Sequence, residues 1–427
     1  MSFIYKPPTE WIAPDSFPTE QLCQAKEIAI DLETRDPNLK QLGPGYIRGD
    51  GEVVGVSFAI DGYADYFPFG HEAGFNFSKK KVLEFTKKIC ATNSDKIFHN
   101  ATYDVGWLAK EGITVNGRII DTMIVAPLID ENQYWYTLNA LGREYINEGK
   151  TEADLNAAAE EWGLDPKAEM WRLPSAYVGT YATQDAALTL KLWNHFKVLL
   201  EEQNLWNIFD LEIDVLPVVL AMKQKGVRVD IERAESLKVE LIKREKQIIQ
   251  KIKKESGVPE VQLWAAKSLA KVFDELKLTY VRTPTGLPSF TKAFLENHTH
   301  PVANLIREAR EVNKTHSTFI DSILKHEHNG RIHAEIRQLR GEAGGTVTGR
   351  LSMSNPNLQQ VPARNKEIGP LIRSLFLPEE GEQWCSADFS QQEPRILTHY
   401  ASRSKYEGAE AIADAYHEGD ADFHQEV

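Results

Sequence analysis

Runs of apolar residues in the first part of the chain predict a small group of strands. The apolar run at residues 27–30 ends at Asp31, and the β-branched run at 53–60 lies between Gly-Asp and Asp-Gly turns, so both are typical of strands. A third strand is predicted at 63–69. The short connections between these three runs favour an antiparallel meander.

Further along, the apolar pattern becomes mainly helical. Residues 97–98 end a short strand, and a helix is expected to begin near Thr102. A long helix is predicted over roughly 178–202, and a heptad-like pattern predicts another at 231–254. The stretch 281–301, with its Thr-Pro-Thr-Gly sequence, is expected to be less regular.

Three acidic motifs are placed at the ends of these elements. They read Asp31-Leu-Glu33-Thr, Asn-Ala-Thr-Tyr-Asp104, and Tyr181-Ala-Thr-Gln-Asp185. The first two acids are two apart on a strand, so they face the same side, and the residues of the last motif are four apart and share a helical face. Four carboxylates brought together would repel one another unless a cation lay among them. Hard divalent ions such as Mg²⁺ suit carboxylate oxygens, and a pair of them can promote phosphodiester cleavage.

Each motif alone has an ordinary explanation, since Asp-x-Glu can end a solvated strand and Tyr-x-x-x-Asp can be a packed helical pair. In this order and on these elements, however, they resemble the signatures of the DEDDy group of 3′–5′ exonucleases. That resemblance implies an RNase H-like fold, with a mixed sheet and flanking helices. It implies that Asp31, Glu33, Asp104 and Asp185 are metal ligands, and that Tyr181 orients or helps to deprotonate the attacking water.

The second half carries two further blocks. One is a long polar stretch at 348–364, whose Gly, Ser, Asn and Pro residues would also suit a surface loop. The other, Trp384-Cys-Ser-Ala-Asp388, is predicted to be a short strand that delivers an acid, followed by a polar turn and a helix. These blocks, and the segment 211–230, resemble the motifs of family A DNA polymerases, the bacterial polymerase I group and its phage relatives.

The resemblance to that family implies roles for single residues. Asp388 corresponds to the first of two palm aspartates that hold the catalytic Mg²⁺ pair, and Glu393 to the residue that crowds the sugar 2′ position. Pro394 departs from the leucine of many relatives, but proline is tolerated in the first turn of a helix. The residues implied in DNA binding are Asn100, Arg350, Asn357, Gln359 and Arg364.

Two parts of the polymerase machinery are not found after Arg395. Two-metal phosphoryl transfer requires a second carboxylate opposite Asp388, and the family's fingers helix grips the incoming nucleotide; neither motif is present. Either a separate C-terminal polypeptide completes a split polymerase, which is the hypothesis we favour, or the chain is a fragment. The expected cofactor is Mg²⁺ or Mn²⁺, and the expected partners are a single-stranded 3′ end, a primer–template and that C-terminal polypeptide.

Charge is distributed unevenly along the 427 residues. The net charge is −13, yet residues 221–350 have 24 Lys and Arg against 16 Asp and Glu. A basic helical segment would suit a thumb that follows duplex phosphates, although a solvated helix face explains any single lysine. The three cysteines, Cys23, Cys90 and Cys385, are widely spaced and are expected to be reduced core residues of a cytoplasmic protein, the host cytoplasm for a phage protein.

The predicted architecture is therefore α/β, with a lead-in at 1–24, an exonuclease domain at 25–203, a mainly helical thumb at 204–335, and an incomplete α+β palm at 336–427. The loop 35–50 either lines a single-strand entrance, with a base stacked on Tyr46, or is plain surface. A DNA polymerase component with proofreading is the expected function. The alternatives are a stand-alone DEDDy nuclease acting on RNA or DNA and a non-catalytic clamp, which the polymerase blocks and the intact acids respectively disfavour.

Overall fold

The computed structural model describes residues 9–342, 344–362 and 365–419. Described residues up to Leu377 form one compact unit, and those from Pro378 form a second. The mixed α/β architecture predicted from the sequence is confirmed, whereas the predicted domain boundaries stay predictions. No helix among the described residues combines the length and apolarity needed to cross a bilayer.

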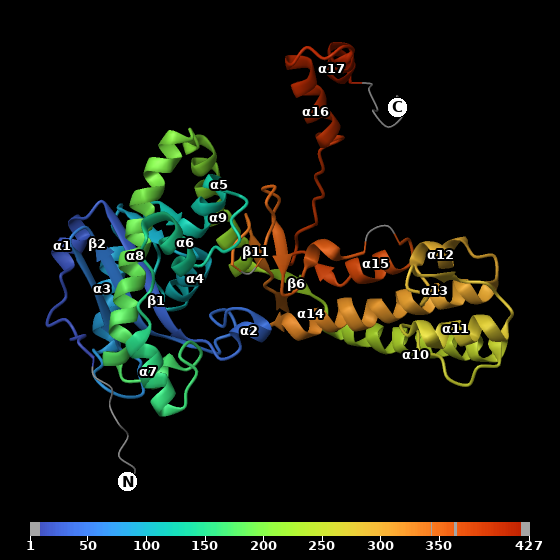
Figure 1. Ribbon diagram of the computed structural model, residues 1–427, viewed down its shortest axis with the longest axis horizontal. Helices are drawn as coiled ribbons and strands as arrows, with labels where there is room; N and C mark the ends of the chain where they lie inside the picture. The colour runs from blue at the N-terminus through green and yellow to red at the C-terminus, as the bar shows by residue number, and fades with distance from the viewer. Residues whose placement is uncertain (1–8, 343, 363–364, 420–427) are drawn as a thin grey trace, which may run out of the picture. The chain divides into compact units, whose positions relative to one another are not determined.

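The exonuclease region is built on a five-stranded mixed sheet in the order β3-β2-β1-β4-β5 (Figure 1). The predicted meander is present, since β1 pairs antiparallel with β2 and β2 with β3, while β4 and β5 are parallel to β1 and to each other. The elements of this region are α1 (Thr19–Gln24), β1 (Glu27–Arg35), α2 (Leu39–Leu42), β2 (Glu52–Ile60), β3 (Tyr63–Pro68), α3 (Lys79–Cys90), β4 (Asp95–Phe98), α4 (Ala101–Lys110), β5 (Ile119–Asp121), α5 (Thr122–Ile129), α6 (Leu138–Ile146), α7 (Ala153–Trp162), the 3₁₀ turn η1 (Met170–Arg172) and α8 (Ser175–Glu202).

The alternation of side chains along β1 decides where its acids lie. Ile28, Ile30 and Leu32 pack into a core with residues of α3 and α4, whereas Ala29 packs into a separate core with residues of α5, α6 and α8. Because successive side chains of a strand point to opposite faces, Asp31 and Glu33 share the face of Ala29. The acids of β1 are therefore directed to the side of the sheet that α8 covers.

The rest of the first unit is mainly helical, as predicted. Its elements are α9 (Trp206–Lys225), β6 (Val227–Val229), α10 (Ile231–Ser256), α11 (Ala266–Glu275), β7 (Val281–Arg282), β8 (Pro288–Ser289), α12 (Lys292–Asn297), α13 (Pro301–Lys314), the π-helical turn η2 (Thr315–Ile320), α14 (Asp321–His326), β9 (Glu327–His328), β10 (Arg331–Ile332), β11 (Glu335–Arg337), β12 (Ser352–Ser354), the 3₁₀ turn η3 (Leu358–Gln360), α15 (Ile368–Arg373) and β13 (Phe376–Leu377). The long helices α10 and α13 pack side by side on their own apolar core (Figure 1). Helix α9 adds Leu216 and Leu220 to the exonuclease core, so it joins the two parts.

The second unit contains α16 (Gln392–Arg403) and α17 (Ala409–Glu418). The predicted helix after Asp388 is present as α16, but the predicted strand before it is wrong. Residues 382–389 form no strand, and Trp384 and Phe389 are 61% and 80% exposed. A strand needs a partner for its backbone groups, and no described strand pairs with this segment.

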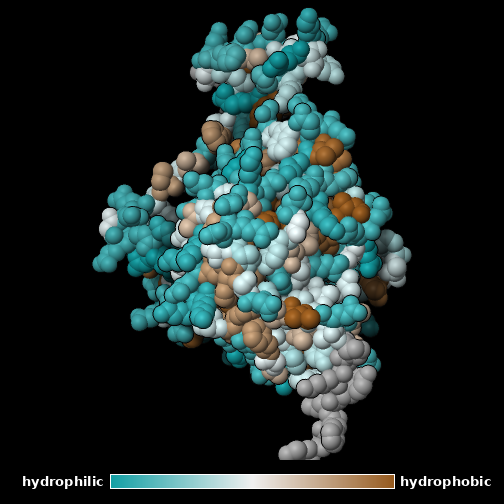
Figure 2. Space-filling view, turned by 90° about the vertical axis from the view of Figure 1, so that its left-hand side faces the viewer, coloured by the Kyte–Doolittle hydropathy of each residue, from teal (hydrophilic) through white to brown (hydrophobic). Residues whose placement is uncertain are grey.

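Exposure also corrects one prediction about cysteine. All three cysteines are free, and Cys90 is buried as predicted, but Cys23 is only half-buried and Cys385 is exposed. On the face shown in Figure 2, apolar residues occur as separate spots among hydrophilic ones. Such scattered apolar residues are ordinary on a surface that meets water.

Candidate active site

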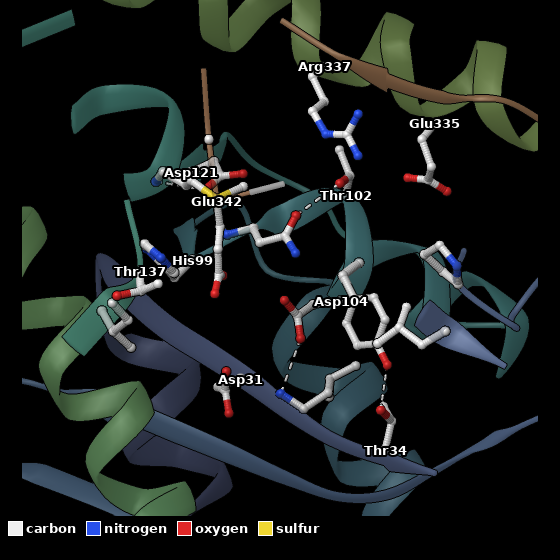
Figure 3. A pocket seen from close by; sticks show the side chains of 18 of the residues that line it. Asp31, Thr34, His99, Thr102, Asp104, Asp121, Thr137, Glu335, Arg337 and Glu342 are labelled. Atoms are coloured by element: carbon white, nitrogen blue, oxygen red, sulfur yellow. Dashed lines mark hydrogen bonds between the residues drawn. The ribbon is translucent and has the colours of Figure 1, made fainter. Parts of the chain in front are cut away.

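A pocket of about 730 Å³ lies at the end of the exonuclease sheet. Its lining includes the acids of β1, the start of α4, one face of α8, and the segment 335–342. Figure 3 shows Asp31 and Asp104 on one side of this pocket and Glu335 and Arg337 on the other. Residues distant in the sequence thus meet in one concave site.

All four predicted metal ligands line this pocket, and three of them form a close cluster. Carboxylate oxygens of Asp31, Glu33 and Asp185 lie within 4.8 Å of one another. Glu33 and Asp185 are buried, at 6% and 3% exposure, and Asp31 is partly open to the pocket. The two acids of β1 meet Asp185 because α8 crosses the sheet over that face. The acids of the first and third motifs therefore meet, whereas Asp104 of the second motif is not part of this group.

Asp104 lies beside these acids but is held by the backbone. Strand β1 pairs with β4 only over residues 27–29, so the N–H of Leu32 has no partner on that edge. Asp104, in the first turn of α4, accepts this N–H at 3.2 Å. Its carboxylate is thereby fixed against the strand that carries Asp31 and Glu33, although it is not one of the three within 4.8 Å.

Lys150, which no motif predicted, provides a cation inside the pocket. Its Nζ donates to Asp185 Oδ2 at 2.5 Å and to the Tyr181 hydroxyl at 3.2 Å. The ammonium also lies 4.9 Å from the centre of the Tyr181 ring. Lys150 follows α6 in an irregular stretch, so neither periodicity nor spacing could have singled it out.

Burial and mutual repulsion change the acidity of the whole cluster. Burial and the Asp185 charge raise the pKa of Asp31 to about 7, and burial followed by the neighbouring carboxylates raises the pKa of Glu33 well above its ordinary value. Burial also raises the pKa of Asp185, against the opposing effect of Lys150. Such carboxylates resist ionising together, so a strongly positive group is needed to keep the cluster charged.

The pKa values of two groups next to the cluster, the phenol of Tyr181 and the ammonium of Lys150, are also shifted. Burial and then Asp185 raise the pKa of Tyr181 well above its usual range, so its hydroxyl stays protonated. Burial would lower the pKa of Lys150, but Asp185, Asp31 and Glu33 outweigh it and the pKa is raised. Lys150 is therefore a stable positive charge among the acids.

Asp121 is a second residue that the motifs did not predict. It is buried and accepts backbone N–H groups of Asn100, Ala101 and Met123 at 2.8–2.9 Å. Its signal in the sequence is an acid directly before a helix, which is a common N-cap. Asp121 caps α5 and fixes the start of α4, and Asn100 sits there in a left-handed conformation with φ of 73°.

The loop 35–50 has a mixed outcome. Leu39, Lys40, Gly43 and Pro44 line the pocket, so the loop does border the site. The suggested base stacking on Tyr46 is wrong, because Tyr46 is only 6% exposed. Its ring packs in the exonuclease core beside Trp107 and beneath the Lys223 ammonium.

The predicted polymerase residues that the structure describes lie at exposed positions. Arg350, Asn357 and Gln359 are exposed around β12 and η3, where the Asn357 side chain caps η3 and Gln359 donates to the Leu351 carbonyl. In the second unit, Asp388 is exposed and Glu393 lies exposed in the first turn of α16. Arg364 lies outside the described residues. The roles of these residues stay predictions.

Two family models match the chain. Residues 18–201 match the 3′–5′ exonuclease model, and residues 231–427 match the model of DNA polymerase family A. The boundary between the two matches lies in the region of α9, the helix that joins the two parts.

Similar proteins agree with these matches. The chain is 36% identical to a DNA-directed DNA polymerase of Pseudomonas phage M6, over 95% of this chain and 64% of the relative. It is 32% identical to DNA polymerase DpoZ of Acinetobacter phage SH-Ab 15497, over 92% of this chain and 66% of the relative. The chain thus spans slightly less than two thirds of the length of these phage relatives.

A solved structure shares the fold. The polymerase domain of Pol1 from M. smegmatis, in complex with a DNA primer–template and dNTP, superposes with a TM-score of 0.71 at 22% identity, over 94% of this chain and 63% of that one. With both family models, the phage relatives and the shared fold in agreement, the chain belongs to DNA polymerase family A and carries a 3′–5′ exonuclease domain ahead of its polymerase segment.

Proposed function

We propose that this chain removes nucleotides from the 3′ end of DNA as the proofreading part of a DNA polymerase. The observation that supports this most directly is the meeting of Asp31, Glu33 and Asp185 within 4.8 Å in an open pocket. An acidic cluster alone is not evidence of a nuclease. Here the cluster lies in a domain that matches the 3′–5′ exonuclease family.

The donor set fits divalent cations. All candidate ligands are carboxylate oxygens, which Mg²⁺ and Mn²⁺ prefer. Asp185 Oδ1 is buried and has no hydrogen-bond partner among the described residues, so one acceptor is left unsatisfied unless a cation or water meets it. Asp31, Glu33, Asp104 and Asp185 would hold the ions, which activate water and stabilise charge at the phosphate when bound.

The chain's own residues have distinct tasks around that phosphate. Tyr181, kept neutral by its raised pKa, offers a hydroxyl that orients an attacking water by hydrogen bonding. Because a phenol that stays protonated is a poor base, we favour the orienting role of Tyr181 over proton abstraction. Lys150 holds Asp185 and Tyr181 in one geometry through its two hydrogen bonds, and the backbone N–H of Leu32 holds Asp104.

We further propose that residues 336–427 contribute to a polymerase site. In this proposal, Asp388 holds catalytic metal, Glu393 limits the sugar 2′ position, and Arg350, Asn357 and Gln359 hold the primer–template. Synthesis would also need a second carboxylate and a fingers element. We propose that a C-terminal polypeptide supplies both, and that the assembly works in the cytoplasm of a phage host.

Digestion of a 5′-labelled oligonucleotide tests the nuclease proposal. The purified chain should shorten single-stranded DNA from its 3′ end in Mg²⁺ or Mn²⁺, giving a ladder of labelled products, and a chelator should stop the reaction. Asp31→Ala should remove the activity. A chain that leaves DNA intact in both metals, or that digests RNA in preference to DNA, would contradict the proposal.

A further inference from the structure

A segment from the polymerase part of the chain forms a wall of the exonuclease pocket. Residues 335–342, here named the rim segment, fall within the polymerase family match and line the same pocket as Asp31 and Asp185. Arg337 and Glu335 face Asp31 and Asp104 across this pocket in Figure 3. The exonuclease motifs give no reason to expect residues from this segment here.

Several contacts hold the rim segment in place. Glu335 pairs with the buried Lys223 of α9 at 2.7 Å. Gln338 donates to the backbone carbonyl and to the carboxylate of Glu212, also on α9, at 2.8 and 2.7 Å. Since α9 packs into the exonuclease core, the rim segment is a fixed wall of the pocket.

The rim segment also touches the exonuclease helix α5 directly. A Cβ added at Gly341 would lie 3.3 Å from Met123 Sδ, so the Gly341 backbone packs closely against the Met123 side chain. Gly341 and Gly344 exchange backbone hydrogen bonds just beyond it. The side chains that precede Gly341 are therefore held close to the first turn of α5.

The positively charged side chains of this wall differ in whether they already have hydrogen-bond or ion-pair partners. Lys223 is committed to Glu335, and Arg337 donates to the Ser354 hydroxyl at 2.8 Å. Arg340 is half-buried and lines the pocket. Within the described part of the chain, its guanidinium makes no hydrogen bond or ion pair, so its donors are available to a ligand.

A nucleic-acid strand needs such donors here. Every nucleotide brings one phosphate, and the carboxylates around Asp31 repel those phosphates. Cations held by the acids would neutralise the negative charge of only the phosphate that is cleaved. The phosphates further from the 3′ end need positive groups on another wall, and a guanidinium matches phosphate geometry well.

We propose that Arg340, assisted by Arg337, binds a backbone phosphate of the single strand whose 3′ end enters the exonuclease pocket. The choice of a nucleic-acid ligand rests on the proposed function above. The polymerase segment of the chain thus supplies part of the exonuclease's substrate-binding surface. Glu342, exposed on the same segment, opposes this attraction.

Binding of a fluorescein-labelled oligothymidylate, followed by anisotropy in a chelator, tests this inference without hydrolysis. Arg340→Gln should weaken binding by roughly fivefold at low salt and reduce the slope of log affinity against log salt by about 0.7, the value for one lost phosphate contact on a single strand. The ratio of the wild-type affinity to the Arg340→Gln affinity should therefore fall by about 2.6-fold between about 50 and 200 mM salt. Glu342→Gln should bind more tightly.

Arg143→Gln is the matched control, because Arg143 is exposed on α6 and is not among the residues that line the pocket. It should bind like the wild type, and thermal melting should show that all variants are folded. An unchanged affinity and salt slope for Arg340→Gln, or a wild-type chain that does not bind the oligonucleotide, would overturn the inference. Loss of binding in Arg340→Gln without any trimming by the wild type in Mn²⁺ would instead refute only the proposed nuclease.

Discussion

Two aspartates of this chain, Asp31 and Asp388, follow apolar runs in the sequence, yet the backbone around them has different secondary structure. Asp31 lies in β1, which pairs with β2 over residues 29–35 and with β4 over residues 27–29. Asp388 follows Trp384-Cys-Ser-Ala in a segment that forms no strand. The same local pattern therefore gives a strand in one place and an irregular segment in the other.

The difference comes from what surrounds each run. The apolar side chains before Asp31 are buried between helices, and burial of this kind stabilises a strand far more than its intrinsic preference does. Trp384 and Phe389 remain mostly exposed among the described residues. An apolar run thus specifies a strand only where a neighbouring strand and a covering layer are present.

The difference extends to chemistry. Asp31 is part of a cluster whose members are forced together by the fold, and burial with the Asp185 charge raises its pKa to about 7. Asp388 is exposed to solvent. The buried acids around Asp31 form a cluster that suits cations, whereas the proposed metal site at Asp388 would need further groups.

The largest expected effect is on trimming. Asp185→Asn should slow digestion of a single-stranded 3′ end by roughly a thousandfold or more, because it removes a ligand from the cation site. Asp388→Asn should leave the rate unchanged, because that residue is not among those that line the exonuclease pocket. Rates are compared on one 5′-labelled oligonucleotide. Equal loss in both variants would remove the distinction between the two aspartates.

Primer extension tests the second aspartate. If Asp388 is one palm carboxylate and a further polypeptide supplies the second carboxylate and the fingers, as proposed above, the 427-residue chain should incorporate no nucleotide by itself. Addition of a polypeptide with both should allow synthesis, which Asp388→Ala should abolish while trimming continues. Robust extension by the chain without added protein would show that the missing-half hypothesis is wrong.

Lys150 offers a smaller test of the buried cluster. Lys150→Met leaves Asp185 buried without its ion-pair partner, so the free energy of unfolding in chelator should fall by about 3 kcal/mol. Added Mn²⁺ should recover much of this loss, because a bound cation replaces the missing positive charge. Urea denaturation with and without Mn²⁺ measures both values. Lys405→Met, exposed in the second unit, should change neither, and a metal-independent loss at Lys150 would contradict its role as an internal cation.

The smallest effect concerns pH and a buried histidine beside Tyr66. His71 hydrogen bonds to the Tyr66 hydroxyl at 2.8 Å and to the Leu173 carbonyl at 3.0 Å, and burial lowers its pKa to about 4. Because the unfolded pKa is near 6.5, the stability that His71 contributes is present above pH 6.5 and is lost as the pH falls towards 4. Between about pH 7.5 and 5 the wild type should lose about 2 kcal/mol relative to His71→Gln. The exposed His399 in α16 is the control, and its Gln variant should follow the wild type; parallel pH profiles for all three proteins would refute the prediction.

The sequence predicted the meeting of Asp31, Glu33 and Asp185 because its signals are local. The apolar run before Asp31, the helix start before Asp104 and the four-residue spacing of Tyr181 and Asp185 each specify an element and a face. Their meeting then follows from the family resemblance. Buried strands and long amphipathic helices were predicted for the same reason.

What the sequence did not predict depends on contacts between distant residues. Lys150 lies in an irregular stretch, and only the folded chain brings it to Asp185. The burial of Tyr46 beneath Lys223 depends on α9, far along the chain. The strand expected before Asp388 does not form, because the preference of a short run for extended backbone cannot supply a second strand to pair with.

Manganese binding, measured by the loss of the free Mn²⁺ signal in electron paramagnetic resonance, tests whether Asp31 and Asp185 form a cation site. The wild type and Asp388→Asn should bind Mn²⁺ with the same affinity, and Asp31→Asn and Asp185→Asn should each weaken binding by roughly tenfold or more. Equal Mn²⁺ affinity in the wild type, Asp31→Asn and Asp185→Asn would contradict the claim that these acids form the cation site.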